Sequence, residues 1–381
     1  MIYLDNAATS WPKPREVMDA MLKTMKDYGA NPGRSGHWMA IHAARILFYV
    51  RQAMCDLFHV SDPFRFVFCF NCTDALNMAI KGCLDDGDHV ITTFLEHNSV
   101  LRPLKELERQ GKIDLTVVPL GPHGTVEAKQ IQKALRPNTK LVVVNHVSNV
   151  TGAVQPIRAI GKICENHGAL FLVDGAQSAG ILPLDLEAMP IDFYAFAGHK
   201  GLLGPQGTGA LYIKKGRTLK PFREGGTGSN SESWFQPEDI PDRYESGTLN
   251  TPGIAGLGAG IRFVLKHQKE ILQKERELTR ELIEGLLEID GVRVYGPPLN
   301  LPRTGVVSFN IRSLQSGMVG DILDKDFRIA CRAGLHCAPL VHRAQGTVDQ
   351  GTVRLSPGFF NSRDEIRQCL IAIRKISQDY K

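Results

Sequence analysis

Long apolar runs are missing from this sequence of 381 residues, since none reaches the roughly 18 residues that a membrane-spanning helix needs. The first residues, MIYLDNAATSWPKP, also lack the basic segment and the apolar stretch that together mark a secretory signal. The sequence therefore predicts a cytoplasmic protein with no membrane partner.

Blocks of lysine and arginine are absent as well. The 45 basic and 40 acidic residues give a net charge of +5 that is spread along the chain, whereas nucleic-acid-binding proteins more often show a concentrated basic patch. We therefore expect no nucleic-acid partner, and an anionic small ligand fits this charge balance. Hydrophobic residues (43%) and charged residues (22%) occur at the levels of an ordinary globular protein, which argues against disorder.

The sequence also lacks a second cysteine or histidine pair that would complete a metal site. Cys69 and Cys72 match the C-x-x-C pattern, but no partner pair follows at ligand spacing, so we expect no bound metal. In a cytoplasmic protein the eight cysteines are expected to be reduced.

Short apolar segments alternate with segments of helical periodicity over the first half of the chain. Strands are predicted at 65–70, 89–94, 114–119, 140–147, 169–174, 193–197 and 208–213. Helices are predicted between them at 74–83, 98–110, 127–135 and 156–167. Several strands are apolar on both faces, as buried parallel strands are. The alternation predicts an α/β fold in which helices cover both faces of a large, mostly parallel, seven-stranded sheet.

The pattern changes after the last of these strands. Residues 256–288 have apolar side chains at three- and four-residue steps and predict one long helix. Strands near 305–311 and 352–356 and helices near 317–325 and from about 363 are predicted after it. We expect a large domain at 15–255 and a smaller α+β domain made of 1–14 and 256–381. The polar segment 225–250 predicts a long loop, which is more often functional or at an interface than idle.

The clearest chemical pattern is a lysine just past an apolar strand, Lys200 in AGHKGLLGPQGTGALYI. A surface lysine in a loop is the alternative, but a tight, desolvated turn suits a lysine that forms a Schiff base. Asp174 ends the strand LFLVD one strand–helix–strand unit earlier, where ligands gather in open α/β sheets. A helix cap is the alternative for that carboxylate. Together the two residues suit pyridoxal phosphate, because the lysine holds C4′ and the carboxylate keeps the ring nitrogen protonated.

Two further segments follow predicted strands. Thr73 lies where a helix begins, and a hydroxyl with backbone N–H groups at a helix N-terminus makes a phosphate seat. A simple helix cap is the alternative there. His97 follows another strand, where its imidazole would stack on the cofactor ring or serve only as a structural hydrogen-bonding group.

Seven motifs in order connect these segments to a known family. MIYLDNAATS, EHNSV, VSNVTGAVQP, DGAQSAG, AGHKGLLGPQGTGALYI, ESGTLNTPG and RAGLHCAP resemble the class V aminotransferase family, and within it the SUF-type cysteine desulfurases and the selenocysteine lyases. The resemblance runs from residue 1 to about residue 361, nearly the whole chain. It implies the PLP-dependent transferase fold of type I, pyridoxal 5′-phosphate as the cofactor, and a homodimer whose active sites borrow residues across the interface.

The resemblance also implies residue roles around the cofactor. Lys200 matches the Schiff-base lysine, Asp174 the partner of the ring nitrogen, and Gln177 a donor to the 3-oxygen of the cofactor. His97 matches the histidine that stacks on the ring. Asn149 matches the asparagine that contacts the substrate or the ring oxygen.

Phosphate and substrate ligands are implied in the same way. Thr73 and His199 match phosphate ligands, and Thr248 matches a phosphate ligand given by the other subunit. Arg354 matches the arginine that clamps the substrate carboxylate, for which a bidentate fork is well suited. Arg332 is assigned to substrate binding together with Asn149 and Arg354.

This sequence departs from the SUF-type pattern at two places. Ala197 replaces the serine that commonly precedes the Gly-His-Lys of the Schiff-base site, which removes one phosphate hydroxyl. We expect cofactor binding to survive, with another hydroxyl or the backbone compensating. Leu335 and His336 stand where the family has paired histidines, which changes the surroundings of the cysteine loop.

Cys337 matches the cysteine that takes sulfur from the substrate. It lies in a glycine-containing loop with Arg332 and His336 close by, and cationic neighbours favour the thiolate. Cys331 is the second candidate, although it ends an apolar segment and is expected to be buried. The other six are assigned to buried structural positions or, for the last, to the phosphate turn: Cys55, Cys69, Cys83, Cys164, Cys369 and Cys72.

The resemblance thus implies a PLP-dependent cysteine desulfurase, in which Lys200 moves the substrate proton and Cys337 receives sulfur from L-cysteine as a persulfide, leaving L-alanine. The sulfur then passes to an acceptor protein or a reductant. A selenocysteine lyase acting on L-selenocysteine is the first alternative. A class V aminotransferase without sulfur chemistry and a non-catalytic protein of the same fold are the others.

Overall fold

The large sheet predicted from the sequence is present in the computed structural model, which describes residues 1–33, 35–121 and 124–380. In spatial order its strands are β2 (Phe66–Cys69), β8 (Gly209–Ile213), β7 (Phe193–Ala197), β6 (Leu170–Asp174), β5 (Thr139–Asn145), β3 (Asp88–Thr93) and β4 (Ile113–Val118). The strands run parallel except β8, which is antiparallel to both of its neighbours. The predicted α/β fold with seven strands is therefore confirmed.

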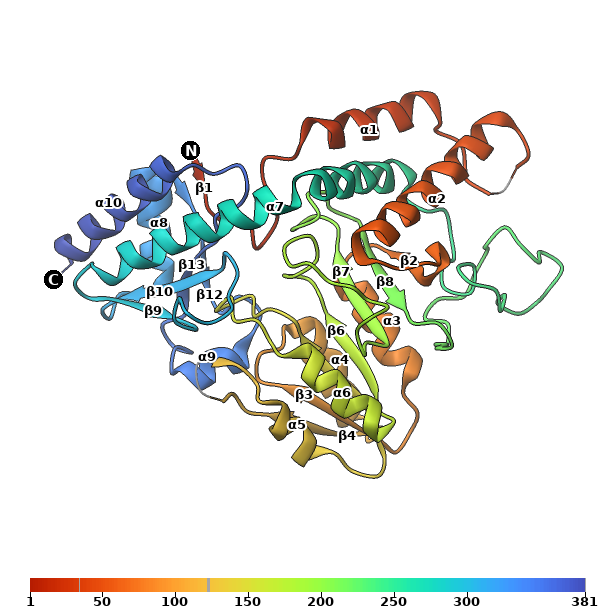
Figure 1. Cartoon of the computed structure of the whole chain (residues 1–381), viewed down its shortest axis with the longest axis horizontal. Coiled ribbons are helices and arrows are strands. Elements are labelled where there is room, and N and C mark those ends of the chain that lie inside the picture. Colours follow the sequence, from red (N-terminus) through yellow and green to blue (C-terminus); the bar gives the residue numbers. More distant parts are fainter. Residues whose placement is uncertain (34, 122–123, 381) are drawn as a thin grey trace.

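Helices cover both faces of this sheet because its strands are apolar on both sides (Figure 1). Along β6, Leu172 joins one core and Val173 the other. The helices α3 (Cys72–Cys83) and α4 (Asn98–Arg109) pack into the core that contains Leu172. The core that contains Val173 is covered by α2 (Trp38–Phe58), α5 (Ala128–Ala134), α6 (Ile157–His167) and the first part of α7 (Thr251–Leu287).

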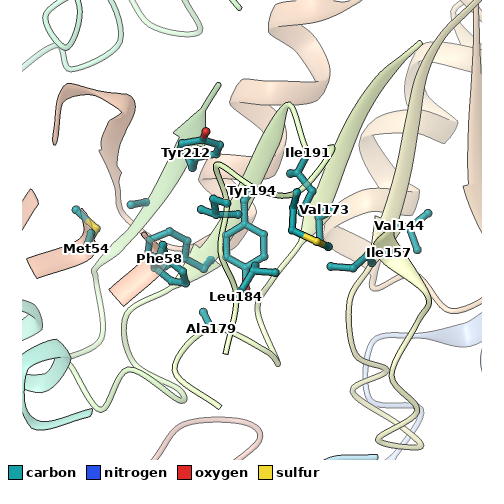
Figure 2. Packing of buried hydrophobic residues seen from close by; sticks show 14 of the residues in the cluster. Met54, Phe58, Val144, Ile157, Val173, Ala179, Leu184, Ile191, Tyr194 and Tyr212 are labelled. Carbon is teal, nitrogen blue, oxygen red and sulfur yellow. The ribbon is translucent and has the colours of Figure 1, made fainter. Parts of the chain in front are cut away.

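An aromatic cluster fastens α2 to the centre of the sheet. The ring of Phe58 lies edge-on to Tyr194, with 5.6 Å between ring centroids, and 5.1 Å from Phe196. Figure 2 shows Phe58 beside Tyr194, with Met54 and Tyr212 nearby. Buried aromatic side chains remove large apolar areas from water, so β7, the strand that leads to Lys200, is held firmly in the core.

A second, smaller sheet lies at the end of the molecule where both chain termini are found (Figure 1). Its antiparallel strands, in order, are β12 (Arg332–Gly334), β13 (Thr352–Leu355), β10 (Val307–Ile311) and β9 (Val292–Tyr295). Nearby, β1 (Ile2–Tyr3) pairs in parallel with β11 (Ile329–Ala330). The remaining elements are α1 (Arg15–Asp27), η1 (Pro63–Arg65), α8 (Ser316–Phe327), α9 (Pro339–Gln345) and α10 (Arg363–Asp379).

The long helix α7 joins the two parts. Its buried residues up to Ile271 belong to the core of the large sheet, and those from Leu278 onward belong to the core of the small one. The domain boundary at 255/256 stays a prediction, and we propose that the change of core between Ile271 and Leu278 marks it better. Although α7 has 37 residues, neither it nor any other helix in the described part of the chain is long and apolar enough to cross a membrane.

Glycine on α7 allows this helix to touch the turn that follows β7. A Cβ atom at Gly260 would lie 2.4 Å from the carbonyl oxygen of Leu202 and 2.9 Å from the backbone nitrogen of Gly204. Both are backbone atoms in the turn that begins with Lys200, so only a residue without a side chain fits there.

We expect Gly260→Ala to destabilise the protein by about 1–3 kcal/mol, because the added methyl group overpacks a backbone contact. Chemical denaturation measures this change. Gly317→Ala is the matched control, since a Cβ there meets nothing within 4 Å, and we expect it to be neutral or stabilising by up to about 1 kcal/mol. Equal effects of the two substitutions would contradict the proposed contact.

Candidate active site

A cavity opens at the carboxyl ends of the central strands of the large sheet. Its walls include all but one of the residues predicted to bind the cofactor: Thr73, His97, Asn149, Asp174, Gln177, His199 and Lys200. Parallel strands end at one edge of a sheet, so residues that follow β3, β5, β6 and β7 converge there.

The side chain of Lys200 lies in a tight turn after β7. The backbone of this turn is fixed by a hydrogen bond from Gly198 N to Thr208 O (2.8 Å) and by Ser10 Oγ, which donates to Lys200 O (3.0 Å). Burial lowers the pKa of the Lys200 amine, although Cys72 and Asp174 act in the opposite direction. Desolvation therefore favours the uncharged amine, which is the form that reacts with a carbonyl carbon.

Asp174 ends β6, the strand next to β7. One of its carboxylate oxygens, Oδ1, accepts hydrogen bonds from the backbone N–H of Ala176 (2.9 Å) and from Sγ of Cys72 (3.4 Å). Burial raises the pKa of the Cys72 thiol well above its ordinary value, so the thiol keeps its proton and stays a donor. These two contacts hold the carboxylate in one orientation at the cavity wall.

His97 caps the N-terminus of α4 with its ring. Its Nδ1 accepts from the backbone N–H of Ser99 (3.1 Å), which places the proton of the neutral ring on Nε2. Burial lowers the pKa of His97 to about 4. The ring is therefore neutral near pH 7, as suits a side chain that stacks on a flat cofactor.

The predicted phosphate seat lies at the start of α3. Asn71 caps this helix by accepting from the backbone N–H of Asp74 (2.9 Å), and Thr73 Oγ1 lies 2.7 Å from Ser99 Oγ. Nearby, Nδ1 of His199 is buried without a hydrogen-bond partner, and burial lowers the pKa of His199 to about 4.

These residues fit pyridoxal phosphate. Two buried polar atoms at the cavity, His199 Nδ1 and Asn149 Oδ1, have no partner within the described part of the chain. Such atoms are costly to leave unpaired. With a helix N-terminus, a buried amine and an oriented carboxylate, they complete a set that matches the phosphate, aldehyde and ring nitrogen of this cofactor.

Two predicted ligands are placed differently from the other six. Gln177 lines the cavity, but its Nε2 donates to Ala7 O (2.9 Å). Thr248 is exposed and does not line the cavity of its own subunit; its Oγ1 accepts from Asn31 Nδ2 (3.0 Å). Its role as a ligand for a partner subunit stays a prediction.

The cysteine loop docks onto the rim of this cavity. The carbonyl oxygen of Cys337 accepts from Asn98 N at 2.7 Å, and that of His336 accepts from Asn149 Nδ2 at 2.6 Å. Both loop residues have left-handed backbones, with φ of 49° at His336 and 58° at Cys337. Arg332 Nη2 donates to Cys337 Sγ at 3.4 Å, and a guanidinium there stabilises negative charge on sulfur.

The expectation that His336 adds a second positive charge beside Cys337 is wrong. Its side chain is buried, and Nε2 lies 3.0 Å from Thr352 Oγ1 and 3.1 Å from Thr352 O. Burial lowers the pKa of His336 to about 2, so the ring is neutral. Arg332 is the cation in contact with the thiol.

The other cysteines have thiols that burial holds in the protonated form. Burial raises the pKa of Cys331, the second candidate, to about 12. Burial also raises the thiol pKa of the remaining six, which are Cys55, Cys69, Cys72, Cys83, Cys164 and Cys369. These seven thiols are therefore poor nucleophiles near neutral pH.

Arg354 lies on β13 directly opposite Arg332 on β12. Its side chain is 1% exposed. Its Nη2 donates to Asp5 Oδ1 (2.8 Å) and its Nη1 to Asn149 O (3.0 Å). The predicted carboxylate clamp is thus held by a carboxylate from the N-terminal segment.

Sequence reasoning assigned no role to two residues that contact the site, Asp5 and Ser99, and it placed Cys72 in the phosphate turn without a contact to Asp174. Asp5 lies in the first family motif, MIYLDNAATS, but nothing in the sequence places it beside a residue about 350 positions away. Ser99 supplies a hydroxyl next to Thr73 and follows the predicted ring-stacking histidine by two positions. Its nearness to His97 in the sequence was the available clue.

Comparison with known proteins identifies the family and several similar proteins. Residues 2–369 match the family model for class-V aminotransferases. The chain is similar to a "Probable cysteine desulfurase" of Methanothermobacter thermautotrophicus, with 38% identity over 96% of this chain and 92% of that protein. It is also similar to a "Cysteine desulfurase" of Yersinia pseudotuberculosis, with 32% identity over 99% of this chain and 94% of that protein. The apo structure of a cysteine desulfurase from Thermococcus onnurineus NA1 superposes with a TM-score of 0.92 at 34% identity, covering 99% of this chain and 95% of that one.

The thiol environments predict which cysteine reacts first with an alkylating reagent. In the native protein, iodoacetamide should label Cys337 well before Cys331, because Arg332 donates to Cys337 Sγ whereas burial raises the pKa of the Cys331 thiol to about 12. Peptide mass spectrometry measures both rates in one sample. Arg332→Ala should slow labelling of Cys337 by on the order of tenfold. Faster labelling of Cys331 would contradict this description of the loop.

The buried ring of His336 predicts an acid-sensitive contribution to stability. Between pH 6.5 and 4.5 the unfolded chain binds a proton at this histidine and the folded chain does not, so stability falls as the pH falls. His336→Gln should reduce the dependence of the unfolding free energy on pH by about 1.4 kcal/mol per pH unit. Urea unfolding at several pH values measures it. The exposed His167 is the control, and His167→Gln should leave the dependence unchanged.

Proposed function

The chain belongs to the class-V aminotransferase family, and on this premise we propose that it is a pyridoxal-phosphate-dependent cysteine desulfurase that converts L-cysteine to L-alanine. The observation that carries the proposal is the docking of Cys337 at the rim of the cavity that holds Lys200, by way of the Asn98 N to Cys337 O bond of 2.7 Å. An aminotransferase needs no thiol at that place. The relatives named as cysteine desulfurases support the same activity.

Lys200 and Asp174 support the carbon chemistry. When bound, pyridoxal phosphate supplies an electron sink for negative charge that develops at the substrate α-carbon. Lys200 Nζ holds the cofactor and then moves the proton of the α-carbon, for which its desolvated amine is suited. With the cofactor bound, the carboxylate of Asp174 would hold a proton at the ring nitrogen, and the neutral imidazole of His97 would be suited to stack on the ring.

Phosphate binding would come from Thr73, His199 and the N-terminus of α3. The serine that the family commonly has at residue 197 is absent, and we propose that the Ser99 hydroxyl, 2.7 Å from Thr73 Oγ1, compensates for it. Thr248 would serve the partner subunit of a homodimer. The exposed apolar side chains of Trp234 and Phe235 on the same loop suit burial against such a partner.

Cys337 performs the sulfur transfer. Its thiolate attacks the substrate sulfur, a new S–S bond forms, and the substrate C–S bond breaks with its electron pair remaining on the carbon skeleton. A proton at that carbon completes L-alanine, and the enzyme keeps one extra sulfur as a persulfide. Arg332 stabilises the attacking sulfur anion, while Arg354 and Asn149 would bind the substrate carboxylate and direct it. A sulfur-acceptor protein or a reductant then removes the persulfide sulfur.

The test is product analysis with L-cysteine. With a thiol reductant such as dithiothreitol present, the parent should form L-alanine and sulfide in equal amounts. Without the reductant, it should show one added sulfur on the peptide that contains Cys337. Cys337→Ala should lower alanine formation by at least about 100-fold, because the nucleophile is lost, and Cys331→Ala should leave it nearly unchanged. No alanine from L-cysteine, together with rapid cleavage of L-selenocysteine by the Cys337→Ala variant, would reject the desulfurase in favour of a selenocysteine lyase.

A further inference from the structure

The ion pair between Asp5 and Arg354 joins the N-terminal segment to the predicted substrate clamp. Asp5 Oδ1 accepts from Arg354 Nη2 at 2.8 Å, and the two side chains are 20% and 1% exposed. We propose that Asp5 is a positioning residue, which fixes the guanidinium of Arg354 in the orientation that receives the substrate carboxylate. This inference rests on the proposed function, since it concerns the recognition of the amino-acid substrate.

The hydrogen bonds of Arg354 leave part of its fork available. A guanidinium has five N–H donors. Asp5 takes one on Nη2 and the carbonyl of Asn149 takes one on Nη1, whereas Nε is buried and has no partner in the described part of the chain. Asp5 and Asn149 therefore hold the plane of the guanidinium from two sides, and the remaining N–H groups are those that a planar anion such as a carboxylate would use.

Charge is the second reason for a carboxylate at this place. Arg354 and Arg332 lie opposite each other on neighbouring strands, so two positive charges stand side by side next to the cysteine loop. Arg332 contacts the sulfur of Cys337, and Asp5 is the counter-charge of Arg354. Burial lowers the pKa of Arg354, and the charge and hydrogen bond of Asp5 act in the opposite direction.

The backbone around Asp5 is itself held in place. Asp5 forms an isolated parallel β-bridge with Ser356, which directly follows β13 and lies two positions after Arg354. Ser356 N donates to Leu4 O at 2.7 Å, and Asn6 N donates to Ser356 O at 3.2 Å. The carboxylate is thus presented by a segment with little freedom, which is what a positioning role needs.

In a competing explanation, the Asp5 carboxylate occupies on Arg354 the place that the substrate carboxylate would take, and the substrate must displace it. The two explanations predict opposite effects. Loss of a positioning residue weakens the binding of carboxylate ligands, whereas loss of a carboxylate that must be displaced strengthens it.

The experiment measures binding of two ligands to the holoenzyme by isothermal titration calorimetry. L-Alanine carries the carboxylate, and ethylamine is L-alanine without it. In Asp5→Ala the Kd of L-alanine should rise by at least about tenfold, and that of ethylamine should stay nearly the same. Asp5→Asn keeps an acceptor without the charge and should show a smaller rise for L-alanine. With L-cysteine, KM should rise more than kcat falls.

The variants and controls keep the outcome decisive. Asp5→Asn carries the test if Asp5→Ala does not fold. Asp192→Asn is the matched control, because Asp192 pairs with Arg217 at the end of β7 that is far from Lys200. This substitution should leave the ratio of the Kd of L-alanine to that of ethylamine unchanged. Tighter binding of L-alanine by the Asp5 variants, or equal loss for both ligands, would overturn the proposal. If the parent makes no alanine from L-cysteine, the proposed function fails, while the two-ligand comparison still tests Asp5.

Discussion

Desolvation of one amine is the constraint on which the rest of this structure depends. An ammonium group removed from water is costly, and at the cavity wall burial lowers the pKa of the Lys200 amine. The surroundings maintain that condition. Aromatic packing holds β7, Gly260 lets α7 close over the following turn, and Ser10 ties the turn to the N-terminal segment. Each contact helps to fix the strand and the turn from which Lys200 reaches the cavity.

The chemistry of sulfur transfer comes from the other part of the fold. Cys337, Arg332 and Arg354 lie on or beside the small sheet, and the cavity lies at the edge of the large one. Two segments hold these parts together near the site. Backbone carbonyl groups of the cysteine loop accept hydrogen bonds from Asn98 and Asn149. The N-terminal segment brings Asp5 to Arg354. The site therefore depends on contacts between residues far apart in the sequence.

Burial also decides the charge pattern of the site. His336 is buried and His97 and His199 are partly buried, and this lowers the pKa of each ring, so all three are neutral at pH 7. Positive charge near the thiol then comes from Arg332, whose guanidinium stays charged at this pH. A neutral ring can stack on a cofactor and a charged guanidinium can bind an anion, so the two kinds of side chain take different roles.

The sequence by itself determined the alternation of strands and helices, because apolar periodicity records which faces are buried. All seven strands of the large sheet and the long helix were predicted to within a few residues. The helices α1, α2 and α9 and the short strands β1, β9, β11 and β12 were not predicted. Strands of two to four residues are too short to show an alternating apolar pattern. Lys200, Asp174 and Cys337 could be proposed because each lies in a distinctive local motif.

Only the tertiary structure decided what surrounds these residues. The sequence places His336 next to Cys337 and implies a cation there, yet the fold turns the ring toward Thr352 and buries it. The sequence leaves Cys331 as a second candidate nucleophile, and in the fold burial raises the pKa of its thiol and keeps it protonated. It separates Asp5 from Arg354 by most of the chain, and the pairing of the N-terminal segment beside β13 brings them within 2.8 Å. Protonation and ion pairing depend on solvent exposure and on distances across the chain, and a local sequence pattern contains neither.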